Sequence, residues 1–303
     1  MDSADAPGLL RIGELSRRVG VSDHVLRAWE NRYGLLSPVR SAGGFRLYSE
    51  NDERRVRRMQ AELANGLSAA QAARVALAGD LPVGVADRAV QEVPPVDGAA
   101  AVFGVALDAM DEPGAQGALD QLLNEFTVET VLRDVVIPYL HDLGERVAQG
   151  VVGIGQEHFA SHVIRGRLAG LARGWGGGRG PHAVLACPPE EYHDLALMVF
   201  GIVLARNGWR IGYLGANTPI ADVLRIAEDS TPELVVLAAT VPERLTPITG
   251  ELRQLASAAP LALAGAGAGQ AIADETGAWL LAGDPVSEAL RVTRASDLTD
   301  RGA

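Results

Sequence analysis

The strongest constraint on the fold is a regular alternation of short β-rich segments with helical segments in the C-terminal part of the chain. Five strand–helix repeats imply a doubly wound parallel sheet, because parallel neighbours need crossover connections. The sequence therefore predicts an α/β Rossmann-like domain over residues 181–297, and open sheets of this kind bind ligands at the carboxyl ends of their strands. The candidate strands are residues 183–187, 210–214, 234–238, 261–265 and 279–282.

The loop after the first candidate strand places an imidazole beside two carboxylates. His193 lies two residues after Glu191 and directly before Asp194, where a buried strand gives way to a helix. An imidazole in such a loop can be an axial metal ligand that a neighbouring carboxylate orients through the other ring nitrogen. We therefore expect His193 to bind a metal at this edge of the sheet.

Two more loops reach the same edge. Thr240 follows the third candidate strand, and Gly265 and Gly267 belong to a run of alternating alanine and glycine after the fourth. The glycine run has some likeness to a nucleotide-binding loop, but it lacks a Walker lysine and comes too late in the domain for a dinucleotide fingerprint.

The segment before the sheet is predicted to be helical. Residues 99–173 show helical apolar spacing with breaks near Pro113, Thr127 and residues 150–153, which indicates a small four-helix bundle. Glu157 and His158 stand near the start of the last of these helices. His158 and His162 lie one turn apart and could form a metal pair, but zinc-protease chemistry has little support because no glutamate lies between them.

The N-terminal segment is basic although the chain is acidic. Its net charge is −11, yet residues 9–60 carry eleven arginines against six acidic residues. A basic module joined to an acidic remainder is typical of a DNA-binding head with a separate sensor or partner domain.

The spacing in this head predicts a winged helix-turn-helix over residues 8–78. A first helix ends at Gly20, and Ser22 or Asp23 can cap a second helix that runs to about Arg32. A hairpin around Gly43-Gly44 then forms a wing. A short helix over residues 68–77 precedes a predicted linker over residues 79–98.

Four motifs carry a resemblance in the head: Ile12-Gly13-Glu14-Leu15, Leu26-Arg27-Ala28-Trp29-Glu30, Arg32-Tyr33-Gly34-Leu35 and Gly44-Phe45-Arg46-Leu47-Tyr48. Through them the head closely resembles the MerR family of transcription regulators. The resemblance implies that the second helix enters the major groove of DNA and that the wing arginines and Tyr48 grip phosphates. The implied DNA contacts are His24, Arg27, Arg32, Tyr33, Arg40, Arg46 and Tyr48.

The three loops at the sheet edge, with a helical cap before them, resemble the cobalamin-binding fold. The residues that carry this resemblance are Glu191, His193, Thr240, Gly265 and Gly267. It implies that His193 replaces the benzimidazole base as the lower axial ligand of cobalt, with the adjacent Asp194 among the cofactor-binding residues. It also implies that the nucleotide tail of the cofactor lies in a groove lined by small residues.

A MerR head joined to such a domain resembles the CarH/LitR family of light-sensing repressors. The cap motif of that family is Trp-x9-Glu-His, which Glu157 and His158 match, while Val147 stands in place of the tryptophan. The resemblance implies adenosylcobalamin, with methyl- or hydroxocobalamin as alternatives, and it makes His158 a possible cobalt ligand after illumination. Val147 and Ala196, which replaces a motif glycine, favour a domain that does not sense light.

Taken together, the residues and resemblances predict a multidomain, non-enzymatic transcription regulator with a MerR-type winged head, a four-helix cap and a Rossmann-like cobalamin domain. We expect a repressor with no catalytic residues, whose assembly and operator binding are controlled by adenosylcobalamin, with light as the signal. Its expected partners are double-stranded DNA, other copies of itself as a dimer or tetramer, and an antirepressor protein. The alternative is a light-insensitive regulator that binds another cobalamin or chromophore, or docks a partner.

The chain carries neither a signal-type nor a membrane-length apolar run, and Cys187 is its only cysteine. We therefore expect a cytoplasmic protein that does not contact membranes.

Overall fold

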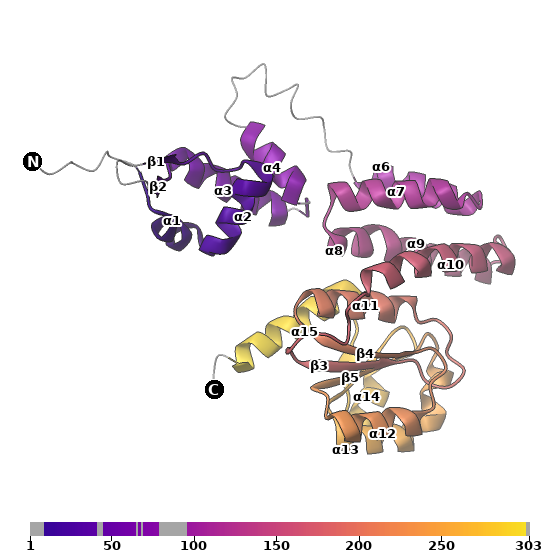
Figure 1. Ribbon diagram of the computed structural model, residues 1–303. Helices are drawn as coiled ribbons and strands as arrows, with labels where there is room; N and C mark the ends of the chain where they lie inside the picture. Colours follow the sequence, from indigo (N-terminus) through magenta and orange to yellow (C-terminus); the bar gives the residue numbers. More distant parts are fainter. Residues whose placement is uncertain (1–8, 41–44, 65, 68, 79–95, 301–303) are drawn as a thin grey trace, which may run out of the picture. The chain divides into compact units, whose positions relative to one another are not determined.

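The computed structural model describes residues 9–40, 45–64, 66–67, 69–78 and 96–300 (Figure 1). Within them the chain forms two units. The first comprises Met1–Ala106 and Pro113–Val131, and the second comprises Leu107–Glu112 and Leu132–Ala303. In the described part of the chain, no helix is both long enough and apolar enough to cross a membrane.

The first unit begins with the predicted helix-turn-helix. Helix α1 (Ile12–Val19) ends at Gly20, whose φ of +69° lies in the left-handed region that favours glycine. The hydroxyl of Ser22 accepts a hydrogen bond from the Val25 amide, so Ser22 rather than Asp23 caps helix α2 (Asp23–Tyr33).

The predicted wing is confirmed as a hairpin. Strand β1 (Val39–Arg40) pairs antiparallel with β2 (Arg46–Leu47), and Tyr48 continues the pairing by exchanging two backbone hydrogen bonds with Leu10. The predicted turn at Gly43-Gly44 lies outside the described residues. Helices α3 (Glu50–Ala64) and α4 (Ala69–Ala78) pack on each other, and they also contact α1 and α2 respectively.

The predicted breaks divide the middle of the chain into helices as expected. The helices are α6 (Val96–Asp108), α7 (Glu112–Glu125), α8 (Val128–Val131), the π-helical turn η1 (Leu132–Val136), α9 (Ile137–Ala148) and α10 (Ile154–Leu171). Helix α6 starts inside the predicted linker, whose residues 79–95 lie outside the described part. The first unit holds most of α6 with α7 and α8, whereas the second holds α9 and α10, so a cap domain over residues 99–173 stays a prediction.

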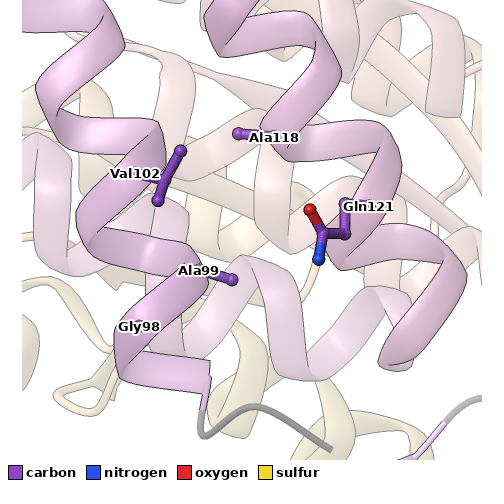
Figure 2. Close-up of a pocket in the computed structure, with 5 residues that line it drawn as sticks. All are labelled: Gly98, Ala99, Val102, Ala118 and Gln121. Atoms are coloured by element: carbon purple, nitrogen blue, oxygen red, sulfur yellow. The ribbon is translucent and has the colours of Figure 1, made fainter.

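A small pocket opens between α6 and α7 (Figure 2). Gln121 is the one polar side chain among the five lining residues, the others being Gly98, Ala99, Val102 and Ala118. This lining offers no histidine, cysteine or carboxylate side chain.

The second unit contains the predicted parallel sheet. Every observed strand boundary falls within one residue of the predicted one. The strands are β3 (His182–Ala186), β4 (Arg210–Gly215), β5 (Leu234–Ala238), β6 (Leu261–Ala264) and β7 (Trp279–Leu281), in the order β4-β3-β5-β6-β7. Because β4 and β5 lie on opposite sides of β3, the loops leaving β3 and β5 part at a topological switch point, where such folds bind ligands.

Helices cover both faces of the sheet (Figure 1). Helices α11 (Leu195–Arg206) and α15 (Pro285–Asp300) pack together on one face. The other face carries α12 (Ile220–Ser230), α13 (Thr249–Ala258) and α14 (Gln270–Thr276), which pack in series. Nearly every residue of α11 is buried, as expected for a helix that is apolar all round.

Gly265 and Gly267 press the loop after β6 against the loop after β5. A Cβ atom on Gly265 would lie 2.3 Å from the carbonyl oxygen of Ala239, and one on Gly267 would lie 2.4 Å from that of Val241. The Gly267 amide also donates a hydrogen bond to Ala239 at 2.9 Å. The resemblance to the cobalamin-binding fold implies that a nucleotide tail passes these glycines. The contact between the two protein loops already requires residues without a side chain at both positions.

We expect Gly265→Ala to lower the free energy of unfolding of the sheet domain by roughly 2–4 kcal/mol. The residue has a φ of +85°, and the new methyl group would overlap the Ala239 backbone. Gly269→Ala is the matched control, because no atom lies within 4 Å of its Cβ position and its φ is −132°. Chemical denaturation of both variants measures the difference. Equal losses would contradict the loop contact.

Candidate functional site

The carboxylate of Glu191 is buried where the loops after β3 and β5 part. The amide and the hydroxyl of Thr240 donate hydrogen bonds to its Oε2 at 2.7 and 2.6 Å. The amide and the Nδ1 atom of His193 lie 2.9 and 2.7 Å from its Oε1. Glu191 is only 1% exposed, so a single buried side chain joins the two loops on either side of the switch point.

These contacts fix the chemistry of the His193 ring. An ionised carboxylate only accepts hydrogen bonds, so Nδ1 carries the proton and donates it to Glu191. In the neutral ring, Nε2 then presents an unprotonated lone pair. The His193 side chain is 75% exposed, whereas that of Glu191 is 2% exposed. The loop thus presents an oriented imidazole with a free coordinating atom.

Hydrogen bonding keeps Glu191 ionised. Burial by itself would raise the pKa of this carboxyl group, but the hydrogen bonds from Thr240 and His193 outweigh burial and lower the pKa to about 2. The carboxylate is therefore ionised at neutral pH.

The backbone of the His193 loop is held in an unusual conformation. Glu190 has a φ of +65° and Asn217, in the loop after β4, has a φ of +52°. The Asn217 side chain accepts a hydrogen bond from the Glu190 amide at 2.8 Å, and the Asn217 amide donates to the Glu191 carbonyl at 2.8 Å. Non-glycine residues with a positive φ are strained and persist only where the surrounding structure holds them. They cluster at functional sites.

Asp194 does not occupy the role that the sequence suggested for it. Its side chain is 5% exposed, and both carboxylate oxygens already have partners: the guanidinium of Arg165 and the hydroxyl of Tyr213, which donates at 2.8 Å. We therefore correct the prediction that Asp194 contacts a cofactor, because its oxygens face the protein interior.

Helix α10 carries two predicted site residues, Glu157 and His158, near its start. It also carries Arg165, which pairs with Asp194 in the His193 loop and lies seven residues, about two turns, after His158. The His158 side chain is 74% exposed and its Nε2 lies 3.6 Å from Glu157, whose carboxylate accepts a hydrogen bond from Ser161. Val147 lies half-buried near the end of α9.

The donor set fits a metal that brings most of its own ligands. Among the described residues, no three His, Cys, Asp or Glu side chains converge on one point. A lone exposed imidazole suits cobalt in a corrin ring, because the macrocycle supplies the equatorial nitrogens and leaves an axial position open.

One face of α2 is exposed and polar. The predicted DNA contacts His24, Arg27 and Arg32 are all exposed, while Leu26 is buried on the opposite side. The spacing also exposes Asn31, which sequence reasoning did not select although asparagine can bind the edge of adenine. Tyr33 is half-buried, with the Arg32 guanidinium 5.7 Å from its ring centroid.

The wing is tied to α2 through Glu30. Its carboxylate accepts a hydrogen bond from the Tyr48 hydroxyl at 2.8 Å and pairs with the Arg46 guanidinium at 3.2 Å. The prediction that Tyr48 grips a phosphate is wrong, because its side chain is fully buried. Burial and the hydrogen bond with Glu30 raise the pKa of Tyr48 to about 12.

Arg46, a predicted DNA contact of the wing, is partly exposed. It has Glu30 as a partner but keeps a side-chain exposure of 42%. Arg40 lies opposite Arg46 in the hairpin, and its side chain lies outside the described part of the structure. An additional pair at this edge is Arg11 with Phe45, whose ring centroid lies 4.8 Å from the guanidinium.

Comparison with known proteins matches two segments of the chain to protein families. Residues 10–78 match the model of the MerR HTH family of regulatory proteins, and residues 103–171 match the B12 binding domain. The chain is 30% identical over 257 residues to the HTH-type transcriptional repressor CarH of Myxococcus xanthus, covering 84% of this chain and 86% of that protein. The repressor CarA of the same organism is 31% identical over 265 residues, covering 86% and 87%.

The chain belongs to the CarH/CarA family of HTH-type transcriptional repressors. As a member it is a DNA-binding regulator with a B12-binding domain and not an enzyme. The structure of the monomethylamine corrinoid protein of Methanosarcina barkeri matches with a TM-score of 0.53 at 14% identity, covering 64% of this chain and 96% of that one. This likeness shows a shared fold.

Sequence reasoning missed Arg165, Tyr213 and Glu30 as organisers of the two sites. Arg165 and Tyr213 lie 29 and 19 positions from Asp194 in the sequence, and no motif joins them. For Glu30, its place in the motif Leu26–Glu30 on the predicted recognition helix was the only available signal.

We expect Glu191→Gln to destabilise the sheet domain by about 2–3 kcal/mol at neutral pH. The NH₂ group of the glutamine would face the hydrogen-bond donors of Thr240 or His193, where the carboxylate has only acceptors. The folded-state pKa of about 2 lies below the ordinary value of 4.5, so the ionised group stabilises the fold above pH 4.5 and loses this effect as pH falls toward 2. Urea denaturation between pH 7 and about pH 3 should therefore show the wild type losing its advantage over the variant on acidification.

Glu190→Gln is the matched control. Its side chain is 75% exposed and pairs only with Arg244 among the described ion pairs, so we expect a change within about 0.5 kcal/mol. A loss in Glu191→Gln that stays constant from neutral to acidic pH would contradict the account of the buried carboxylate.

Arg46→Ala and Tyr48→Phe distinguish a DNA-contacting residue of the wing from a buried one. With a duplex that the wild type selects from a random pool, Arg46→Ala should weaken binding and lower the slope of log affinity against log salt by about one. Tyr48→Phe removes only the buried hydroxyl, so we expect lower stability by about 1 kcal/mol and an unchanged slope. An unchanged affinity and slope in Arg46→Ala would remove the wing from the interface.

Proposed function

We propose that this chain is a cobalamin-controlled repressor in which His193 is the lower axial ligand of cobalt and light is the signal. The observation that carries the proposal is the oriented His193 ring, with Nδ1 bonded to a buried, ionised Glu191 and Nε2 presented at the switch point of the sheet. Membership of a repressor family and the match to a B12 binding domain support it.

Each part of the site has a proposed task. His193 binds the metal, while Glu191 and Thr240 orient it. Glu157, His158 and Val147 belong to the helices before the sheet and would help to hold a bound cobalamin. When bound, adenosylcobalamin supplies a carbon–cobalt bond that light can break.

The N-terminal head binds the operator DNA in this proposal. Helix α2 presents His24, Arg27, Asn31 and Arg32 to the major groove, and Arg46 contacts the backbone of the duplex. An assembly with several heads binds an operator more tightly than one head does, because the later heads bind intramolecularly. Control of assembly by the cofactor thereby becomes control of transcription.

Val147 favours a second candidate function. A valine is much smaller than the tryptophan of the cap motif and leaves the upper side less enclosed. The second candidate is a light-insensitive regulator that binds a different cobalamin or chromophore, or that responds to a docked protein such as an antirepressor.

Absorbance spectra and size-exclusion chromatography decide between the two. Protein loaded with adenosylcobalamin in the dark should elute as a tetramer, and green or blue light should change its spectrum and dissociate it. Methyl- and hydroxocobalamin are the comparison ligands. Identical size before and after illumination removes the light signal, and failure of all three to bind removes the cofactor.

Val147→Trp tests the contribution of the cap. If position 147 encloses the upper ligand, the variant should bind adenosylcobalamin more tightly relative to hydroxocobalamin than the wild type does. An unchanged ratio of the two affinities would show that this position does not face the upper ligand.

A further inference from the structure

Arg165, Asp194 and Tyr213 join three elements of the second unit directly beside His193. Arg165 comes from α10, Asp194 from the His193 loop and Tyr213 from β4. The guanidinium pairs with both oxygens of the carboxylate, and its Nη1 atom also lies 3.7 Å from the sulfur of Met198 on α11. The Tyr213 hydroxyl donates to Oδ2 at 2.8 Å.

The carboxylate of Asp194 is not used in the usual way for its position. Asp194 is the N-cap of α11, where an aspartate commonly accepts a hydrogen bond from its own helix, yet it makes no such bond. Both oxygens turn instead to Arg165 and Tyr213. The Asp194 side chain is 5% exposed and the Arg165 side chain 43%, so a buried carboxylate is held from the protein surface by a two-pronged, directional pair.

Arg165, Asp194 and Tyr213, together called the joint, are held rigidly by the residues around them. The Tyr213 ring packs edge-on against Trp175, with 5.2 Å between the ring centroids. Asp194 follows His193 in the chain, so consecutive Cα atoms are fixed about 3.8 Å apart. The His193 loop is therefore anchored twice, through Glu191 to the loop after β5 and through Asp194 to helix α10.

We propose that Arg165 and Tyr213 are positioning residues that couple the placement of His193 to helix α10, which carries Glu157 and His158. A displacement of the His193 loop on ligation must move Asp194, and with it the guanidinium that α10 holds. This inference rests on the proposed function, because the ligand of His193 is cobalamin.

A double-mutant cycle between Arg165→Gln and His193→Ala tests the coupling in the full-length protein. The measurement is the dissociation constant for hydroxocobalamin, obtained from its absorbance. We expect His193→Ala to weaken binding about 10- to 100-fold and Arg165→Gln about 5- to 20-fold. If Arg165 acts through His193, the double variant binds no more than about two-fold more weakly than His193→Ala alone.

Conservative variants and a control sharpen the cycle. Arg165→Lys keeps the charge but not the two-pronged geometry and should restore part of the affinity, while Tyr213→Phe should weaken binding about three-fold. Arg225→Gln removes an exposed guanidinium that pairs with Asp222 and should leave binding unchanged. An Arg165→Gln effect of the same factor with and without His193 would overturn the proposal.

Hydrogen exchange of the ligand-free protein separates this proposal from the proposed function. Arg165→Gln should speed exchange in both α10 and residues 188–194, whereas Arg225→Gln should leave both segments unchanged. An unchanged exchange rate in either segment would contradict the proposed coupling between the His193 loop and α10. Failure of the wild type to bind hydroxocobalamin, with exchange altered as expected, instead overturns the proposed cofactor and with it the role of the joint in ligation.

Discussion

The sheet edge depends on one buried negative charge. Glu191 is nearly inaccessible to solvent, and an unpaired carboxylate in that position would destabilise the fold strongly. Four donor groups, two from Thr240 and two from His193, compensate for its burial. Because these donors come from loops on both sides of the switch point, the requirement to satisfy the charge also fixes where those loops lie and which nitrogen of His193 stays free.

A carboxylate has a comparable organising role in the head. Glu30 of α2 binds both Tyr48 and Arg46, so one carboxylate on this helix holds the wing. In both regions the acidic residue orients a neighbour that we propose contacts the ligand, the imidazole of His193 in one region and the guanidinium of Arg46 in the other.

The sequence predicted the features that local patterns encode. Apolar runs located the five strands, of which the central three, β3, β5 and β6, are buried almost throughout, and helical periodicity with glycine and proline breaks located the helices. The link between Glu191 and His193 was accessible because the two residues are close in the chain. The strand order, which brings Thr240 beside Glu191, was not predicted, because it is a property of the assembled sheet.

The errors concern contacts between distant residues. Asp194 looked like a ligand contact and Tyr48 looked like a phosphate contact, because each stands beside a functional residue in its motif. Partners 29 and 18 positions away, Arg165 and Glu30, instead draw these side chains into the interior. For Gly265 and Gly267, predicted to line the groove for the cofactor, the structure adds a separate requirement, the close backbone of the neighbouring loop.

The most direct test of the central claim is the electron paramagnetic resonance spectrum of cob(II)alamin bound to protein labelled with nitrogen-15 histidine. If His193 Nε2 is the lower ligand, the superhyperfine triplet seen with unlabelled protein becomes a doublet on labelling, and His193→Ala abolishes the effect of the label. A triplet that survives labelling would show that the benzimidazole base of the cofactor remains on cobalt, and it would contradict the account given for His193.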